Sequence, residues 1–488
     1  MGLDIVLINP GDRRQAHQDL GKDYSGIEPP FWIAVQAAYL RKRGFGVAVI
    51  DSNAENITPE ETAAMVGEMN PLLAAVLVYG AHPSASTQNM TISGKICRAI
   101  KDLTAVKVAL GGLHPSALPM TTLKEEAVDF VIEGEGPLSL VALLETLRAG
   151  RNDFSNVPGL WYEQDAIVLH TPRAPLISSL DAVLPAGAWD LLPMRTYRAH
   201  NWHCFDDISS RSPYGAVYTS LGCPYSCLFC CINAPFGKPG VRYRSPRLVV
   251  DEIGVMVEKY GVRHLKIIDE LFILNEKHYM AIADLLIERR YDLNIWAYAR
   301  VDTVKPVHLD RMKKAGINWL ALGIESANPA VRDGATKRMQ TGDIASVVRT
   351  IRDAGMSIIG NYIFGLPDDT RATMQETLDL AMDLNCEYGN FYCAMAYPGS
   401  RLYDIAIQNK WELPATWHGY SQLSYETLPL PTKHISAQEV LKFRDQAFLR
   451  YFSNTSYLDA IERKFSTHIR RHIEEMTTLR LKRRILGD

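Results

Sequence analysis

The chain of 488 residues lacks several features that mark whole classes of protein. Its formal net charge is only −3, with 52 Lys and Arg against 55 Asp and Glu, so the overall charge does not predict nucleic-acid binding. The longest apolar run, residues 71–81, is far too short for a membrane-spanning helix. The first residues read as a buried strand and not as a secretory signal. These absences favour a cytoplasmic protein that has no membrane span and binds no nucleic acid.

Cysteine is scarce, and its distribution is uneven. Half of the eight cysteines fall within nine positions of the segment LGCPYSCLFCCINAPFG, residues 221–237. In a reducing compartment, clustered cysteines indicate a metal site or catalysis more than disulfide bonds. The chain has no second CxxC pair that would complete a zinc site of the usual spacing. A polynuclear iron–sulfur site is the stronger prediction, with a zinc site or inert core cysteines as the alternatives.

Residues 1–150 alternate between buried-strand and amphipathic-helix patterns. The predicted strands are residues 4–10, 46–52, 73–80, 107–112 and 130–136. Apolar strands separated by helices predict a doubly wound, flavodoxin- or Rossmann-like parallel sheet. Because such sheets bind ligands at the carboxyl ends of their strands, the residues there are the candidate ligand contacts.

The rest of the chain is expected to form three further parts. Residues 151–210 show no sustained period and are predicted to be an ordered linker. Residues 211–405 contain about six strand–helix units, which predicts a partial (β/α)6 barrel of TIM type with its chemistry at the strand carboxyl ends. Residues 406–488 are predicted to be a helical region that caps this barrel. The cysteine segment follows the first barrel strand and should therefore lie on the functional face.

The cysteine spacing suggests how the site is built. Cys223, Cys227 and Cys230 place three thiolates in one loop, as iron–sulfur clusters require, whereas a cubane cluster normally takes four protein ligands. One iron would then be open to substrate or cofactor. Cys231 is expected to pack nearby without ligating, because adjacent side chains diverge.

The cysteine spacing, with the aromatic Phe229, resembles the CxxxCxΦC signature of the radical S-adenosylmethionine (SAM) superfamily. Further segments match successive motifs of that family's barrel: VRYRSPRLVVDEI (241–253), IIDELFILN (267–275), WAYARVD (296–302), LGIESANPAV (322–331), GNYIFGLPDDT (360–370) and AYPGSRLY (396–403). The resemblance implies a [4Fe–4S] cluster whose open iron binds SAM, and one-electron cleavage of SAM to a 5′-deoxyadenosyl radical. It also implies the residues that contact SAM. Phe229 is expected near the adenine, Asp269 and Glu270 at the amino group, and Arg300 near the polar groups of SAM. Glu325 and Ser326 are expected at the ribose or methionine, and Asn361 lies in the strand that should run along the adenine.

The first domain resembles the cobalamin-binding module of the cobalamin-dependent radical SAM enzymes. The matching segments are NPGD (9–12), residues 28–51, GGLHPSALP (111–119) and GEG (134–136). Many such modules carry a cobalt-binding His in Asp-x-His-x-x-Gly, but this chain reads Asp51-Ser52-Asn53, so that axial bond is not available. The resemblance implies cobalamin contacts at Asp51, Asn53, Tyr79, His82, Ser84, Ser86, Gly111, Gly112, His114, Glu133 and Gly134. A sheet that binds nothing is the alternative.

The resemblance as a whole implies an enzyme that methylates an unactivated carbon through methylcobalamin, after the radical has abstracted a substrate hydrogen. The alternatives are cobalamin-dependent cyclisation, oxidation or rearrangement without methyl transfer, and a non-catalytic iron–sulfur or cobalamin sensor. The expected cofactors are a [4Fe–4S] cluster, SAM and cobalamin. A reductant such as flavodoxin or ferredoxin is the expected partner, and the chain is expected to be a monomer. The sequence identifies neither the substrate nor a catalytic side chain.

Overall fold

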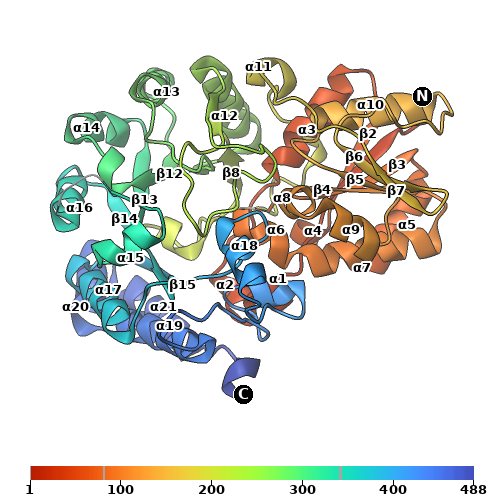
Figure 1. Cartoon of the computed structure of the whole chain (residues 1–488). Coiled ribbons are helices and arrows are strands. Elements are labelled where there is room, and N and C mark those ends of the chain that lie inside the picture. The colour runs from red at the N-terminus through yellow and green to blue at the C-terminus, as the bar shows by residue number, and fades with distance from the viewer. Residues whose placement is uncertain (1, 81–82, 340–342) are drawn as a thin grey trace.

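The computed structural model describes residues 2–80, 83–339 and 343–488, which form two sheets with helices around them (Figure 1). The first sheet has the strand order β2-β1-β3-β4-β5-β6-β7. Its parallel strands are β1 (Ile5–Asn9), β2 (Val47–Asp51), β3 (Leu73–Val78), β4 (Lys107–Gly112) and β5 (Phe130–Ile132). Every residue of β3 is buried, as expected for a parallel strand that is covered on both faces.

Helices cover both faces of this sheet. The helices α3 (Phe31–Lys42) and α10 (Pro137–Arg148) pack into a hydrophobic core on one face. The helices α5 (Pro59–Met69) and α7 (Met90–Leu103) pack into a separate core on the other. Short helices start close behind the strand ends: α4 (Ser52–Glu55), α6 (Pro83–Gln88) and α8 (Leu113–Ala117), and α9 (Pro119–Glu125) follows α8. The predicted doubly wound sheet is confirmed.

The segment predicted as a linker contains regular structure. The strands β6 (Leu160–Gln164) and β7 (Ile167–His170) form an antiparallel hairpin that extends the first sheet beyond residue 150. The segments LWYEQ and IVLH on either side of Asp165 and Ala166 carry a hairpin signal that the linker prediction missed, although most residues of β7 are exposed. Three short helices follow, namely α11 (Leu180–Val183), η1 (Trp189–Leu191) and η2 (Asn201–Cys204).

The second sheet has the order β15-β14-β13-β12-β11-β8, and all of its pairings are parallel. Its strands are β8 (Tyr214–Val217), β11 (His264–Ile267), β12 (Asn294–Arg300), β13 (Ile317–Glu325), β14 (Ser357–Phe364) and β15 (Tyr388–Cys393). The connecting helices are α12 (Pro246–Tyr260), α13 (Glu276–Arg289), α14 (Pro306–Lys314), α15 (Pro329–Gly334), α16 (Ile344–Asp353) and α17 (Arg371–Leu384). Within the described residues β8 and β15 do not pair, so the predicted partial barrel is confirmed and is open along one side.

Segments from both ends of the chain lie along the open side of the barrel (Figure 1). The short helices α1 (Arg13–His17) and α2 (Leu20–Asp23) contact the segment around η4 (Trp417–Tyr420). Ser421 Oγ donates to the Ala16 carbonyl at 2.7 Å, and Gln18 Nε2 donates to the Leu423 carbonyl at 2.7 Å.

The predicted helical C-terminal region is confirmed. Its helices are α18 (Arg401–Gln408), α19 (Ala437–Phe452), α20 (Thr455–Lys464) and α21 (Thr467–Thr478), with a final turn η5 (Arg484–Leu486). Arg444 of α19 donates to the Phe391 carbonyl of β15 at 2.7 Å, which joins this region to the barrel. Among the described residues no helix is long and apolar enough to span a membrane.

Candidate active site

The cysteine segment is a loop that leaves the barrel after a two-residue strand, β9 (Ser220–Leu221), which pairs with β10 (Arg242–Tyr243). Cys223, Cys227 and Cys230 are half-buried, whereas Cys231 is 3% exposed. Backbone bonds hold the loop: the Gly240 amide donates to the Cys223 carbonyl at 3.0 Å, and the Cys230 amide donates to the Cys227 carbonyl at 3.1 Å. All four cysteines line one cavity of about 290 Å³, which we call the cluster cavity.

The donor set in this cavity fits the predicted cluster. Burial raises the pKa of Cys223 to about 11 and that of Cys231 to about 12, so the thiols stay protonated until a metal replaces the protons. Three half-buried thiols on one loop match the three-cysteine set that the sequence predicts for a cubane with one open iron. Positive charge from Lys337 opposes the effect of burial on the pKa of Cys227 and so favours the thiolate.

The sequence did not predict Lys337. It is 7% exposed, it lines the cluster cavity, and its ammonium forms an ion pair with Glu325. Glu325 ends β13 with φ 65°, in the left-handed region that a side chain other than glycine enters only when its surroundings enforce it. The ion pair with Lys337 is part of those surroundings, because it helps to hold Glu325 in this conformation at the edge of the cavity.

Most of the predicted SAM contacts meet in the cluster cavity. Five of the predicted SAM contacts line this cavity, namely Phe229, Glu270, Arg300, Glu325 and Asn361. Burial raises the pKa of Glu270 to about 8, and a cation bound beside it would restore its charge. Arg300 is fixed in place, because its guanidinium donates to Asp302 at 2.9 and 3.0 Å and lies 4.1 Å from the centre of the Tyr225 ring.

Two predicted SAM contacts do not line the cavity. The oxygens of Asp269 accept bonds from the Thr219 amide and hydroxyl and from the Ser220 hydroxyl, at 2.5–2.6 Å. The Ser326 hydroxyl lies 3.2 Å from that of Thr377 and accepts a bond from the Asn328 amide. Both residues are buried behind the cavity wall, where they fix the loops that carry its lining residues.

Several other lining residues are not among the predicted SAM contacts. Tyr392, Met395, Tyr397 and Gln422 come from the end of β15 and the segments after it. Gln422 accepts a bond from the Cys393 amide at 2.8 Å and donates to the Cys393 carbonyl at 2.9 Å. Tyr397 belongs to the motif AYPGSRLY (396–403), whereas Tyr392, Met395 and Gln422 reach the cavity only through tertiary packing, and no local motif identifies these three.

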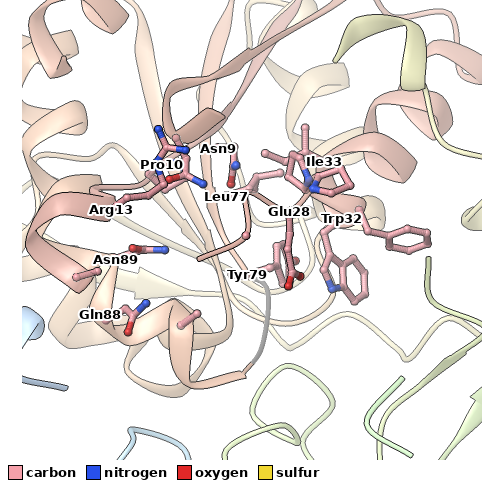
Figure 2. Close-up of a pocket in the computed structure, with 18 of the residues that line it drawn as sticks. Asn9, Pro10, Arg13, Glu28, Trp32, Ile33, Leu77, Tyr79, Gln88 and Asn89 are labelled. Atoms are coloured by element: carbon pink, nitrogen blue, oxygen red, sulfur yellow. The ribbon is translucent and has the colours of Figure 1, made fainter. Parts of the chain in front are cut away.

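A second cavity of about 170 Å³ lies at the carboxyl ends of the first sheet, and we call it the strand-end cavity (Figure 2). Asn9, Arg13, Glu28, Tyr79 and Gln88 are among its lining residues. Within the described residues, Arg13 Nη1 and His17 Nδ1 are buried in its wall without a hydrogen-bond partner. Burial lowers the pKa of His17 to about 4, so its imidazole is neutral at neutral pH. Unsatisfied polar atoms here fit a ligand rich in amide and phosphate groups, as cobalamin is.

The predicted cobalamin contacts divide between this cavity and its surroundings. Asn53 and Tyr79 line it. The Tyr79 hydroxyl already donates to the Glu135 carbonyl at 2.8 Å, and its ring stacks on Trp32 with the centroids 4.7 Å apart. Asp51 is buried beneath, where it accepts bonds from Asn9, from the Ala54 amide and from Tyr197.

The remaining predicted contacts lie elsewhere. Ser84 lines the cluster cavity, and His82 lies outside the described residues. Five of the predicted contacts lie together at the ends of β3, β4 and β5, where hydrogen bonds or close backbone packing hold them. They are Ser86, Gly111, Gly112, His114 and Gly134. Gly112 has φ 136° and could not carry a Cβ, which would lie 2.3 Å from the Val78 carbonyl oxygen. Glu133 accepts bonds from Trp161 and Arg173.

A third cavity, of about 220 Å³, lies inside the open side of the barrel, and we call it the barrel cavity. Aromatic side chains form much of its wall: Tyr24, Trp202, Trp296, Tyr298, Tyr388, Phe391, Tyr392, Tyr397 and Phe448. At one end the Glu28 carboxylate accepts from Lys266 Nζ at 2.8 Å and lies 3.2 Å from His200 Nε2. Since His200 Nδ1 accepts from the Gly26 amide, Nε2 carries the proton and donates to Glu28.

Comparison with known proteins agrees with this arrangement. Residues 217–381 match the Radical SAM superfamily, and residues 18–144 match the B12 binding domain. The chain is 29% identical to an uncharacterized methyltransferase of Pyrococcus horikoshii over 92% of each chain. It is 25% identical to the anaerobic magnesium-protoporphyrin IX monomethyl ester cyclase of Rubrivivax gelatinosus, over 93% of this chain and 78% of that one. The radical SAM methyltransferase TsrM from Kitasatospora setae, solved with cobalamin and a [4Fe–4S] cluster, shares the fold with a TM-score of 0.65 at 21% identity, over 84% of this chain and 78% of that one.

Proposed function

The chain belongs to the cobalamin-dependent radical SAM enzymes, and we propose that it methylates an unactivated carbon of an organic substrate. The observation that carries this proposal is the way the three cavities meet. The barrel cavity shares Ser84, Tyr298, Tyr392, Tyr397 and Gln422 with the cluster cavity. It shares His17, Glu28, Gln88 and His200 with the strand-end cavity. A substrate in the barrel cavity would therefore face both cofactor sites.

Each cavity has a defined task in this proposal. Cys223, Cys227 and Cys230 hold the cluster, while Glu270 and the Glu325–Lys337 pair bind the polar groups of SAM. When bound, the cluster supplies the electron that cleaves SAM, and cobalamin supplies the methyl group. The remaining predicted contacts in the first domain are proposed to hold cobalamin.

The protein's contribution is to orient the substrate and to exclude water. The aromatic wall of the barrel cavity excludes water from a reacting carbon, and its amide side chains orient polar groups of the substrate. The Lys266–Glu28–His200 network lies between the barrel and strand-end cavities and is internally satisfied. We infer that it fixes the boundary between substrate and cobalamin.

The second candidate function is radical cyclisation or oxidation without methyl transfer. It is favoured by the similarity to a magnesium-protoporphyrin ester cyclase over most of both chains. The shared cavities suit this reaction as well, because cyclisation also needs a substrate beside the SAM site.

The products of SAM distinguish these functions. The anaerobically reconstituted protein is incubated with SAM, cobalamin, a reductant and an extract of the source cells, and the nucleosides are measured by mass spectrometry. Methylation yields both S-adenosylhomocysteine and 5′-deoxyadenosine, together with a product heavier by one CH₂. 5′-Deoxyadenosine alone contradicts methyl transfer and supports the second function. No cleavage, as in a Cys223→Ala control, contradicts both and supports a sensor.

The setting of the reaction is part of the proposal. The domains are taken as residues 1–150 for cobalamin, 151–210 as linker, 211–405 as the radical SAM core and 406–488 as the helical C-terminal region, and the hairpin β6–β7 of the linker range joins the first sheet. We propose flavodoxin or ferredoxin as the electron donor, a monomeric protein, and a cytoplasmic location.

A further inference from the structure

A second group of metal-binding side chains lies at the opposite end of the barrel from the cysteine loop. His203 and Cys204 end the linker helix η2, and His264 is the first residue of β11. The cysteine loop follows the carboxyl end of β8, whereas His264 marks the amino end of its neighbour β11. The two groups are therefore separated by the length of the barrel strands.

The geometry of this group is compact. One ligand atom from each of His203, Cys204 and His264 lies within 4.8 Å of the others. His203 is 0% exposed and Cys204 is 1% exposed, while His264 is half-buried. Adjacent side chains normally diverge, as expected for Cys230 and Cys231, but the longer imidazole of His203 brings a nitrogen back towards the Cys204 sulfur.

His203 lacks the hydrogen bonds that a buried imidazole needs. Neither of its ring nitrogens has a hydrogen-bond partner of ordinary geometry within the described part of the chain. Buried polar atoms are nearly always satisfied, and an unsatisfied one destabilises the fold by about 1–3 kcal/mol. A metal ion bonded to one nitrogen would remove the penalty at that nitrogen, and the Asn294 backbone is placed to accept a bond from the ring.

His264 carries hydrogen bonds that a metal would have to replace in part. Its Nδ1 accepts a bond from the Asn294 amide at 3.2 Å, which a metal ion at Nδ1 would replace, and the Ser210 backbone forms a second hydrogen bond with the ring. The same Asn294 amide donates to the His203 carbonyl at 2.7 Å and so joins η2 to the barrel strands. Histidines that bind metals commonly donate their far N–H to a backbone carbonyl, which fixes the tautomer and the ring direction.

We propose that His203, Cys204 and His264 bind a zinc ion, with water as the fourth ligand. Two imidazoles and one thiolate suit zinc, which accepts nitrogen and sulfur ligands in a tetrahedron. The ligand atoms need to close by about 1 Å to reach bonding geometry. His264 is half-buried, whereas His203 and Cys204 are buried, so a water ligand would approach from the side of His264.

The proposed zinc has a structural role. It fastens the linker, which connects the two sheets, to the floor of the barrel. The amino ends of barrel strands are the face where residues serve stability, whereas chemistry lies at the carboxyl ends. Zinc should therefore raise the thermal midpoint of the protein without being required for SAM cleavage.

Zinc K-edge X-ray absorption on the cluster-loaded protein tests this, because it detects neither iron nor cobalt. The protein is produced with added zinc and purified anaerobically. We expect about one zinc per chain, with one sulfur at about 2.3 Å and nitrogens at about 2.0–2.1 Å. Cys204→Ser should lose the sulfur shell and most of the zinc but keep the iron. Cys223→Ala should lose the iron and keep the zinc, and Cys97→Ser, at a buried cysteine of α7, should keep both.

Three outcomes would overturn the proposal. The first is that the wild-type protein contains no zinc. The second is that the zinc in Cys204→Ser still shows its sulfur shell. The third is that Cys223→Ala loses the zinc, which would mean that zinc occupies the cluster site. If Cys204→Ser fails to fold, the proposal is tested instead by removing zinc from the wild-type protein with a chelator. The thermal midpoint must then fall and must recover on addition of Zn²⁺, and an unchanged midpoint contradicts the proposal.

Discussion

Replacing Glu28 with Gln should destabilise the barrel strongly, because it removes the carboxylate from a buried ion pair. The side chains of Glu28 and Lys266 are 8% and 2% exposed, and the variant would leave the Lys266 ammonium facing a neutral amide. Burial alone would raise the pKa of Glu28, but Lys266 and His200 outweigh it and hold the pKa at about 2, against 4.5 for a free glutamate. At 1.36 kcal/mol for each pH unit, this difference corresponds to about 3 kcal/mol. This value agrees with the cost of about 3–5 kcal/mol in folding free energy that is typical when one partner of a buried ion pair is removed.

The effect is measurable as a thermal midpoint, compared between wild type and Glu28→Gln at equal cofactor loading. For a domain of 150–250 residues, a loss of this size lowers the midpoint by about 6–12 °C. The depressed pKa stabilises the folded state fully above pH 4.5, and this contribution is lost as the pH falls towards 2. The advantage of wild type over Glu28→Gln should therefore shrink over that range.

A matched surface pair provides the control. Arg263 and Asp292 form an ion pair with side chains 64% and 84% exposed, so Asp292→Asn should cost less than about 1 kcal/mol. The double variant Glu28→Gln/Lys266→Met should be less destabilised than the sum of its single changes. The reasoning is refuted if Glu28→Gln shifts the midpoint no more than Asp292→Asn does, or if its effect is constant between pH 4.5 and pH 2.

Three further changes test the site and its support. Cys231→Ala should keep the cluster iron that Cys223→Ala loses, as measured by iron analysis and absorbance, and loss of iron from Cys231→Ala would contradict the three-cysteine ligand set. Lys337→Met should weaken SAM binding roughly tenfold, or about 1.4 kcal/mol, in equilibrium titrations at unchanged iron content. Unchanged affinity would remove Lys337 from the SAM site. Tyr197→Phe deletes a 2.7 Å bond to the buried Asp51 carboxylate and should lower stability by about 2 kcal/mol, whereas Tyr425→Phe, at an exposed hydroxyl, should leave it nearly unchanged.

The parts of the site that sequence reasoning reached are those encoded locally. The cysteine loop and the strand ends at Glu270, Arg300 and Glu325 follow from short motifs and from strand periodicity, and these residues line one cavity. Asp269 carries the same local signal as Glu270, but both residues follow β11 in a loop, and there Thr219 and Ser220 of the neighbouring segment satisfy the Asp269 carboxylate.

The residues that sequence reasoning missed depend on contacts between distant segments. Lys337 follows a short helix with no motif, and Gln422 arrives from the C-terminal region by binding the backbone of Cys393. The hairpin β6–β7 was missed although its strands LWYEQ and IVLH carry a local signal, because the surrounding segment 151–210 as a whole shows no sustained period; its addition to the sheet depends on the pairing of β6 with β5. Hydrophobic period and motif spacing predict which face of a helix or strand is buried. Which other segment packs against that face depends on the whole fold and cannot be read from the local sequence.

The closure of the barrel's open side has a consequence for the order in which the protein matures. The bonds from Ser421 to Ala16 and from Gln18 to Leu423 join positions 405 residues apart. During synthesis from the N-terminus, both cofactor-binding domains emerge before residues 421–423 can reach their partners. Until then the barrel cavity remains accessible from the side, and large cofactors need not pass through a closed wall. A segment that is made after both cofactor-binding domains thus closes a cavity that cofactors can already have entered.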